Sequence, residues 1–204
     1  MTTLKNITET NGVFVFKNKH PVMKRLRKGI PGPEIHGDKI WPSSYFIMDY
    51  LEQNPLAEKA RVMEIGCGWG LLSIYCASRF GAKVTGVDAD ENVFPYLKVH
   101  AALNEVKVKT KQCRFENIKR NALAKQDLVA GGDICFWDEL VDPLYKVIMR
   151  ACKEEVGTIV IADPGRGPFL KLAERCEKKF GAELLPWSVA KPRKTEGYLL
   201  VINN

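Results

Sequence analysis

The sequence predicts an α/β domain built on a seven-stranded, mostly parallel sheet that closes with an antiparallel hairpin. Three observations support this fold. From residue 61 onward, strand-like and helix-like segments alternate, which implies right-handed crossovers between parallel strands and helices on both faces of the sheet. Residues 61–70 form an apolar strand that runs through a glycine turn into a helical pattern. The last two strand-like segments, 184–189 and 197–202, are joined by a short polar link that suits a hairpin.

Composition limits the classes of protein to consider. The chain has 204 residues, of which 46% are hydrophobic and 27% charged, as expected for a globular domain with a substantial core. No apolar run approaches the ~20 residues that span a bilayer, and the first residues lack the apolar core of a secretion signal. The six cysteines form no Cys-x-x-Cys pair. We therefore expect a cytoplasmic protein with reduced thiols and no bound metal.

Residues 1–40 are predicted to be an N-terminal extension of the main domain. Residues 12–16 have the pattern of a short strand, and the prolines and glycines that follow predict loops, with an irregular hairpin as the alternative. Part of the net charge of +7 is concentrated in this extension, at Lys17, Lys19, Lys24, Arg25, Arg27 and Lys28. The cluster is either a surface for an acidic protein or nucleic acid, or simply a solvated segment. It lacks the interleaved aromatic residues that stack on bases.

The main domain, residues 41–204, begins with Trp41 and a helix that ends near Asn54. Ser43 or Ser44 is a plausible N-cap for this helix. Because the helix leads directly to the glycine turn, Trp41 is expected to cover a ligand bound there, with a role in filling the core as the alternative.

The glycine turn and the strand after it predict a nucleoside site. The glycines let the backbone approach a ligand closely, and Asp88, 20 residues beyond Gly68 at the end of strand 82–87, is placed to accept hydrogen bonds from ribose hydroxyls. The expected contacts are Gly66, Cys67, Gly68, Gly70, Asp88 and Ala89. They lie at the carboxyl edge of the predicted parallel sheet.

Glu64 and the glycine spacing indicate which nucleoside is bound. The pattern is Gly-x-Gly-x-Gly, whereas dinucleotide sites use Gly-x-Gly-x-x-Gly. Glu64, inside the strand before the turn, would repel a pyrophosphate and attract a ligand that carries an ammonium and a sulfonium. These features predict S-adenosylmethionine (SAM) as cofactor and S-adenosylhomocysteine as product, with Glu64 at the amino acid end of the cofactor.

The following segments complete the predicted site. A helix capped by Asp90 runs to about residue 104, and strand 106–113 ends at Arg114 and Phe115, where an adenine ring would lie. Glu116 or backbone groups are the alternative contacts at that edge. The fourth strand is predicted at residues 133–137, after a polar approach over 126–132.

The end of the predicted fourth strand supplies the candidate catalytic residue. Trp137 and Asp138 lie there and are expected to face the transferred methyl group and the incoming nucleophile. Asp142 is expected to be the N-cap of the next helix, with Pro143 at its first position, which leaves Asp138 available for catalysis. The alternative for Asp138 is a solvated loop acid. A fifth strand at 156–163, the loop 164–168 and a helix ending at Gly181 follow.

At the glycine turn and Asp88 the sequence resembles the class I, seven-strand SAM-dependent methyltransferases, which have a Rossmann-like fold. Three more stretches, 41–55, 132–140 and 163–166, resemble the family-16 protein methyltransferases, which include the lysine methyltransferase of the electron-transfer flavoprotein β subunit. The resemblance implies methyl transfer to a protein side chain, with lysine favoured. That group often has Asp-x-x-Tyr after the fourth strand; this chain has Asp138 and, in place of the tyrosine, Val141.

Other functions stay open at the level of sequence. The basic N-terminal segment favours an RNA substrate, although the chain lacks the Asn/Asp-Pro-Pro-Tyr/Phe arrangement of enzymes that methylate base amino groups. A small-molecule substrate and a non-catalytic SAM-binding role are further alternatives. A dehydrogenase is disfavoured by Glu64 and by the final hairpin.

Overall fold

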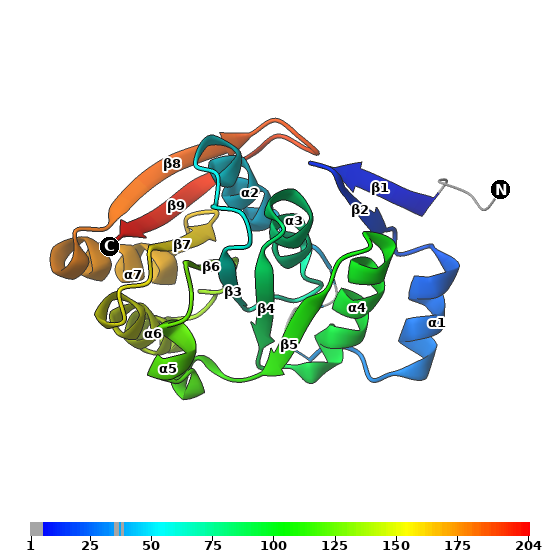
Figure 1. The fold of residues 1–204 in the computed structure, drawn as a ribbon, viewed down its shortest axis with the longest axis horizontal. Helices are drawn as coiled ribbons and strands as arrows, with labels where there is room; N and C mark the ends of the chain where they lie inside the picture. The colour runs from blue at the N-terminus through cyan, green and yellow to red at the C-terminus, as the bar shows by residue number, and fades with distance from the viewer. Residues whose placement is uncertain (1–5, 35–36, 38) are drawn as a thin grey trace.

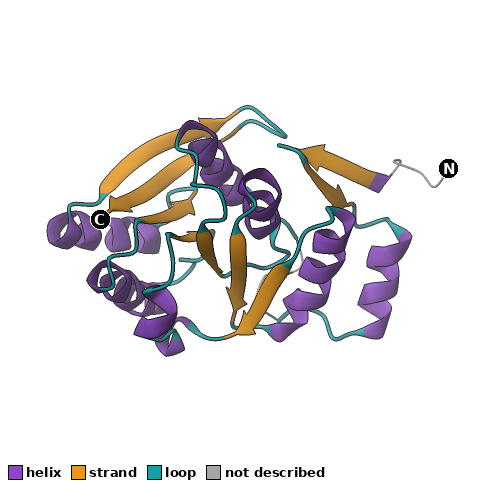
Figure 2. Cartoon of the chain, viewed as in Figure 1, coloured by secondary structure: helices purple, strands orange, loops and turns teal. Residues whose placement is uncertain are grey.

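A computed structural model of the chain describes residues 6–34, 37 and 39–204. Its centre is a seven-stranded sheet of strand order β5-β4-β3-β6-β7-β9-β8 (Figures 1 and 2). The strands from β5 to β7 are parallel, and β9 is antiparallel to both β7 and β8, which confirms the predicted fold class. The strands are β3 Arg61–Ile65, β4 Lys83–Asp88, β5 Val108–Gln112, β6 Leu128–Gly132, β7 Thr158–Asp163, β8 Glu183–Val189 and β9 Thr195–Asn203.

Helices cover both faces because neighbouring strand residues point to opposite sides. Val62 packs in the core beneath one layer of helices, whereas Met63 packs beneath the other. The first layer contains α2 Ser43–Gln53, α3 Leu71–Phe80 and α4 Phe94–Leu103. The second contains α5 Arg120–Leu123, α6 Val141–Lys153 and α7 Gly167–Phe180. Single helical turns lie at η2 Glu91–Val93, η3 Phe115–Asn117 and η4 Asp138–Leu140.

The predicted position of the fourth strand was wrong. The strand is β6, residues 128–132, and residues 133–137 form the loop after it. Positions 131 and 132 of this strand are glycines because a side chain would not fit at either position. A β-carbon on Gly131 would lie 2.7 Å from the carbonyl oxygen of Ile65, and one on Gly132 would lie 3.1 Å from the backbone of α2. Asp133, with φ of 56°, then turns the chain out of the sheet.

The predicted start of α6 was also wrong. The helix begins at Val141, directly after η4, so Asp142 lies inside its first turn and is not the N-cap. The Asp142 carboxylate instead accepts a hydrogen bond of 2.6 Å from Arg175 of α7. Pro143 also lies in the first turn, where a backbone N–H has no intrahelical partner to lose.

The N-terminal extension contains more regular structure than the sequence predicted. Strands β1 Ile7–Thr10 and β2 Val13–Phe16 form a hairpin, and α1 spans Pro21–Gly29. Pro21 lies in the first turn of α1, where it favours the helix instead of breaking it, and the His20 side chain accepts from Val22 N–H.

Asn104 fastens the hairpin to the domain, because its side chain bonds both the N–H and the carbonyl oxygen of Phe14, at 2.7 and 2.8 Å. Among the described residues, no helix is both long enough and apolar enough to cross a membrane.

Candidate functional site

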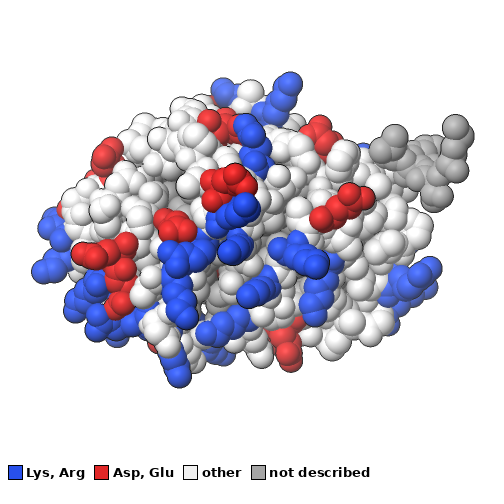
Figure 3. Space-filling view, viewed as in Figure 1, with Lys and Arg blue, Asp and Glu red and all other residues white. Residues whose placement is uncertain are grey.

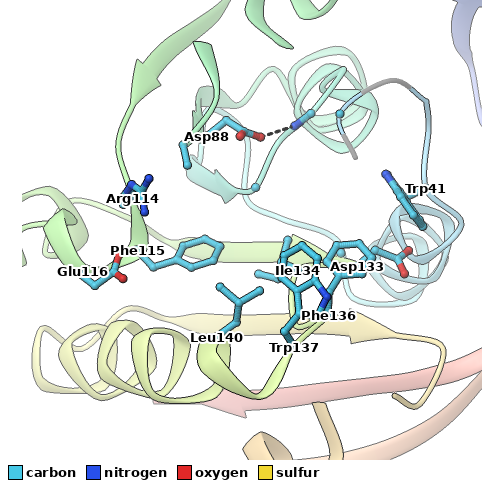
Figure 4. A pocket seen from close by; sticks show the side chains of 15 residues that line it. Trp41, Asp88, Arg114, Phe115, Glu116, Asp133, Ile134, Phe136, Trp137 and Leu140 are labelled. Atoms are coloured by element: carbon cyan, nitrogen blue, oxygen red, sulfur yellow. Dashed lines mark hydrogen bonds between the residues drawn. The ribbon is translucent and has the colours of Figure 1, made fainter. Parts of the chain in front are cut away.

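A cavity lies at the carboxyl ends of β3, β4 and β6 (Figure 4). This is the edge of a parallel sheet at which α/β proteins bind their ligands. Most of the predicted cofactor-binding residues line it: Trp41, Gly66, Gly68, Asp88, Ala89, Arg114, Phe115 and Trp137. The structure therefore brings together residues from five separate segments of the chain. Glu64, Cys67, Gly70 and Asp138, which the sequence also nominated, do not line the cavity.

The three glycines of the turn all have positive φ, but they do different work. A β-carbon on Gly66 would clash with Ile134 of the loop after β6, so Gly66 lets these two segments touch. Gly68 has open space before it and lines the cavity, which leaves room for a ligand against the backbone. At Gly70 a β-carbon would lie 2.5 Å from Leu97, so this glycine allows α3 to pack on α4.

Cys67 also faces away from the cavity. Its side chain is buried, and a β-carbon on Gly86 of β4 would lie 3.0 Å from its Sγ atom. Cys67 and Gly70 thus shape the turn without contacting a ligand in the cavity.

Asp88 holds the turn in place and still faces the cavity. Its Oδ2 accepts from Gly68 N–H at 2.9 Å and its Oδ1 from Asp90 N–H at 3.1 Å; Figure 4 draws the first of these bonds. Burial raises the pKa of this carboxyl, and the two backbone donors oppose that rise. A carboxylate has about four acceptor positions, so two remain for hydroxyl donors. This arrangement fits a ribose bound beside Gly68.

Glu64 has a different role from the one predicted. It is 2% exposed, and its Oε2 accepts from the N–H of Ser73 at 2.9 Å and from the Ser73 hydroxyl at 2.5 Å. The acid therefore fastens the start of α3 to β3. Burial raises the pKa of Glu64 to about 8, so at neutral pH the carboxyl is largely protonated. The structure therefore does not support the prediction that Glu64 attracts a cationic ligand directly.

Aromatic side chains form one wall of the cavity. Trp41 meets Phe136 edge to face, with ring centroids 5.2 Å apart, and the centroids of Phe136 and Trp137 are 5.8 Å apart. Trp137 is 48% exposed, which places it at the rim. Lys39 puts its ammonium 3.9 Å from the centroid of Trp41, in a cation–π contact. Ile134 and Leu140 add apolar surface beside this wall (Figure 4).

Arg166 fixes the loop that carries the aromatic wall. Its Nη1 donates to Asp133 Oδ1 at 2.8 Å and to Asp163 Oδ2 at 2.7 Å, and its guanidinium lies 4.4 Å from the ring centroid of Phe136. Asp133 Oδ2 in turn accepts from the backbone N–H of Ser43. Burial raises the pKa of Asp163, and the Arg166 charge and backbone donors oppose the rise. This network joins the loop after β6 to α2 and to the loop after β7.

Asp138 lies outside the cavity. It begins η4, its side chain is 64% exposed, and its Oδ1 lies 2.8 Å from the ammonium of Lys171. Sequence reasoning missed Asp133, because it placed that residue inside a strand. The available signal was the Gly-Gly-Asp order at the end of β6, where an acid follows two residues without side chains.

Comparison with known proteins supports the assignment of this site. A family model described as a methyltransferase domain matches residues 62–155. The electron transfer flavoprotein beta subunit lysine methyltransferase of Danio rerio is 28% identical over 141 residues, which are 68% of this chain and 54% of that protein. The ubiquinone biosynthesis O-methyltransferase of Marinobacter nauticus is 29% identical over 135 residues, 65% of this chain and 52% of that protein. The chain thus spans about half the length of these curated relatives.

Solved structures show the same fold. The precorrin-6y C5,15-methyltransferase of Geobacter metallireducens superposes with a TM-score of 0.62 at 15% identity, covering 78% of this chain and 86% of that one. TrmK of M. capricolum, solved in complex with S-adenosylhomocysteine, gives a TM-score of 0.57 at 10% identity, covering 78% of this chain and 67% of that one.

Residues 62–155 thus match a methyltransferase domain, and together with the glycine turn and Asp88 these similarities support a class I, SAM-dependent methyltransferase. The methyltransferase domain match and the S-adenosylhomocysteine bound in a protein of the same fold support SAM as the cofactor. Within that class, the similar proteins include both a protein lysine methyltransferase and a ubiquinone O-methyltransferase, so similarity defines the methyl donor and leaves the acceptor to be argued from the site.

Proposed function

We propose that the chain transfers a methyl group from SAM to a protein side chain, with lysine as the favoured acceptor. The observation that carries this proposal is the contact of the Lys39 ammonium with Trp41, 3.9 Å from the ring centroid. Lys39 does not itself line the cavity, but its contact shows that the Trp41 ring of the aromatic wall can hold the ammonium of a lysine. The similarity to an electron transfer flavoprotein lysine methyltransferase points to the same class of acceptor.

The residues of the site divide the work of such a reaction. SAM supplies an activated methyl group, which passes to a nucleophile in an in-line displacement, so the chain mainly aligns the two partners and keeps water out. Gly68 and Asp88 hold the nucleoside, and the aromatic wall orients the amine.

A lysine, whose ordinary pKa is about 10.4, must lose a proton before it attacks. The apolar surface of Ile134, Trp137 and Leu140 lowers that pKa by desolvation. Asp138, which the sequence nominated to guide this proton, would have to leave Lys171 to reach the amine. We therefore propose that the proton passes to solvent at the rim of the cavity, beside the exposed Trp137.

The experiment that tests this function is transfer of labelled methyl groups from SAM into a cell lysate, resolved by size and by sensitivity to protease or nuclease. We expect a discrete protease-sensitive band that yields methyl-lysine on hydrolysis. Replacing Trp137 by alanine should reduce labelling by about tenfold, because part of the wall is lost. Leu170→Ala, which also truncates an exposed apolar side chain but lies outside the cavity, should leave labelling unchanged. Label found only in nucleic acid or in small molecules would contradict the proposal.

A small-molecule hydroxyl is the second candidate acceptor. The apolar lining formed by Phe115, Ile134, Phe136 and Leu140 suits an aromatic ring, and the ubiquinone biosynthesis O-methyltransferases share similarity with the chain. The same lysate experiment separates the two acceptors, since a small product would pass through a size filter and resist protease.

A further inference from the structure

A second hollow lies on the uncovered part of the sheet, away from the cofactor cavity. It is formed around the amino ends of β3, β4 and β5, whereas the cavity lies at their carboxyl ends. Lysine and arginine side chains gather over β4 and β5 on this face in Figure 3. The hollow is lined by Arg61, Lys83, Lys107, Lys109 and Lys125, and the exposed Lys111 follows two residues beyond Lys109 on β5. We call these six residues the basic sheet face.

The alternation of strand residues places these charges together. Lys109 and Lys111 of β5 are exposed, while Val108 between them packs against the core on the opposite face. Lys83 lies opposite Arg61, and Lys109 lies opposite Thr85, two residues further along β4, so cations from three strands share this face. The helices on this side, α5 to α7, pack their apolar residues mainly over β3, β6, β7, β9 and the carboxyl end of β4, where Val87 is buried. The amino-terminal part of β4 and the strand β5 are left uncovered (Figure 1).

The charge on this face is poorly balanced. Arg61 pairs with Asp127 at 3.2 Å, and Glu105 also lines the hollow. Among the residues that the structure describes, no carboxylate forms an ion pair with Lys83, Lys107, Lys109, Lys111 or Lys125. Cations gathered in this way repel one another, and a negatively charged partner would remove that repulsion.

The geometry of β5 selects the form of that partner. In the described part of the sheet, β5 is an edge strand, and no strand pairs with its outer side. An extended peptide can add there through main-chain hydrogen bonds, and its alternate side chains then face those of β5. Lysines on an edge discourage pairing with an uncharged strand, whereas acidic residues at alternate positions would be attracted. No aromatic side chain lines the hollow, so the base stacking that holds single-stranded nucleic acid is absent.

We infer that the basic sheet face binds an acidic, extended segment of the methyl-accepting protein, which adds as a strand to the outer edge of β5. The identity of that partner as the substrate rests on the proposed function; the docking itself does not. The segment would carry Asp or Glu at every second position, opposite Lys109 and Lys111. This surface is distinct from the basic segment of α1, which the sequence had suggested as a partner site.

The test measures fluorescence anisotropy of a labelled ten-residue peptide with glutamate and valine alternating, in the absence of SAM. The triple variant K83Q/K109Q/K111Q should weaken binding by about tenfold, with wild-type binding falling as salt is added. The matched control K24Q/R25Q/K28Q removes the same number of charges from exposed positions of α1 and should change the affinity by less than about twofold. Equal losses in both triple variants would overturn the inference, because they would show attraction by net charge alone.

Two further probes test the kind of partner. A peptide with proline in place of each valine keeps its charge but loses every second backbone N–H, and its proline φ is fixed at about −65°, so it pairs poorly as a strand; equal binding of that peptide would overturn strand addition. A labelled single-stranded oligonucleotide of equal charge that binds more tightly than the peptide, and loses its affinity in K83Q/K109Q/K111Q, would overturn the assignment to a protein.

The lysate labelling assay reports the chemistry separately. If the label appears in small molecules while the alternating peptide still binds the basic sheet face, the docking site stands and only the proposed function fails.

Discussion

At the β3–β4 end of the cavity a ligand meets mainly backbone, whereas at the β6 end it meets side chains. Gly66 and Gly68 shape the first end, and Asp88 locks it through backbone N–H groups of its own and the neighbouring turn. At the second end, Phe136 and Trp137 stand on a loop that is fixed by Arg166. A turn of fixed backbone geometry suits a ligand group that does not vary, such as a nucleoside. Side chains that form a wall can be substituted without altering the fold. The comparison therefore teaches that cofactor binding and acceptor choice reside in separate parts of the cavity.

The largest effect should come from breaking the contact between the two ends. Gly66→Ala puts a β-carbon against Ile134 at a residue with φ of 67°. Relieving the clash must move the turn or the loop, so we expect SAM affinity to fall by about a hundredfold, as measured by titration calorimetry. Gly181→Ala is the matched control, since its φ is 64° but no atom lies within 4 Å of the added carbon. It should cost about 1 kcal/mol of stability and leave SAM affinity unchanged.

Removing the charge that fixes the β6 end should mainly cost stability. Arg166→Met leaves Asp133 and Asp163 buried without their cation, which costs about 3 kcal/mol in the free energy of unfolding. Without the cation, the folded-state pKa of Asp163, which burial already raises, rises further, so the folded state binds more protons than the unfolded one. The variant should therefore regain stability as the pH falls from 7 to 5 in urea titrations.

The control for Arg166 is Arg175→Met, which removes the same side chain from an exposed pair with Asp142. Its melting temperature should match that of the wild type. An Arg166→Met variant with unchanged stability at pH 7 would show that the network does not hold the loop.

These two ends also differ in how far sequence alone could predict them. Gly66, Gly68 and Asp88 were found because each role depends on local backbone geometry and on spacing along the chain. The sequence did not predict the contact between Asp133 and Arg166, because the two residues lie 33 positions apart in the chain. Asp138 was nominated from its place after a strand, but the strand ends earlier, at Gly132, and η4 carries Asp138 outward.

Substitution of Glu64 should have a smaller effect, and it tests how the β3–β4 end of the cavity is held in place. Because burial raises its pKa from 4.5 to about 8, the folded state binds more protons than the unfolded state between these values. This carboxyl therefore favours folding fully below pH 4.5, and its contribution is lost as the pH rises toward 8. Glu64→Gln keeps an acceptor for Ser73, so its unfolding free energy should change less with pH.

The difference between wild type and Glu64→Gln should be measured by urea unfolding from pH 5 to 8. Curves that stay parallel would contradict a protonated Glu64. SAM affinity at neutral pH should change by less than about threefold, because the side chain does not line the cavity.

The smallest effect is expected at the rim. Asp138→Asn removes a carboxylate that is 64% exposed and paired with Lys171, so SAM affinity should persist. If Asp138 guides a proton from the acceptor, turnover should fall while affinity stays constant. From its place outside the cavity we expect turnover within about twofold of wild type, as measured with saturating SAM. A fall of tenfold or more would show that Asp138 moves inward during catalysis.

The central claim is that the cavity beside Gly68 and Asp88 binds SAM, and titration calorimetry tests it directly. SAM and S-adenosylhomocysteine should both bind the wild-type chain, and NAD should not. Asp88→Asn keeps the shape of the side chain but loses acceptor capacity, so affinity should fall by about tenfold to a hundredfold. Asp127→Asn, an exposed acid at the opposite end of the sheet, should bind SAM like the wild type. Equal affinity of both variants, or tighter binding of NAD than of SAM, would contradict the account.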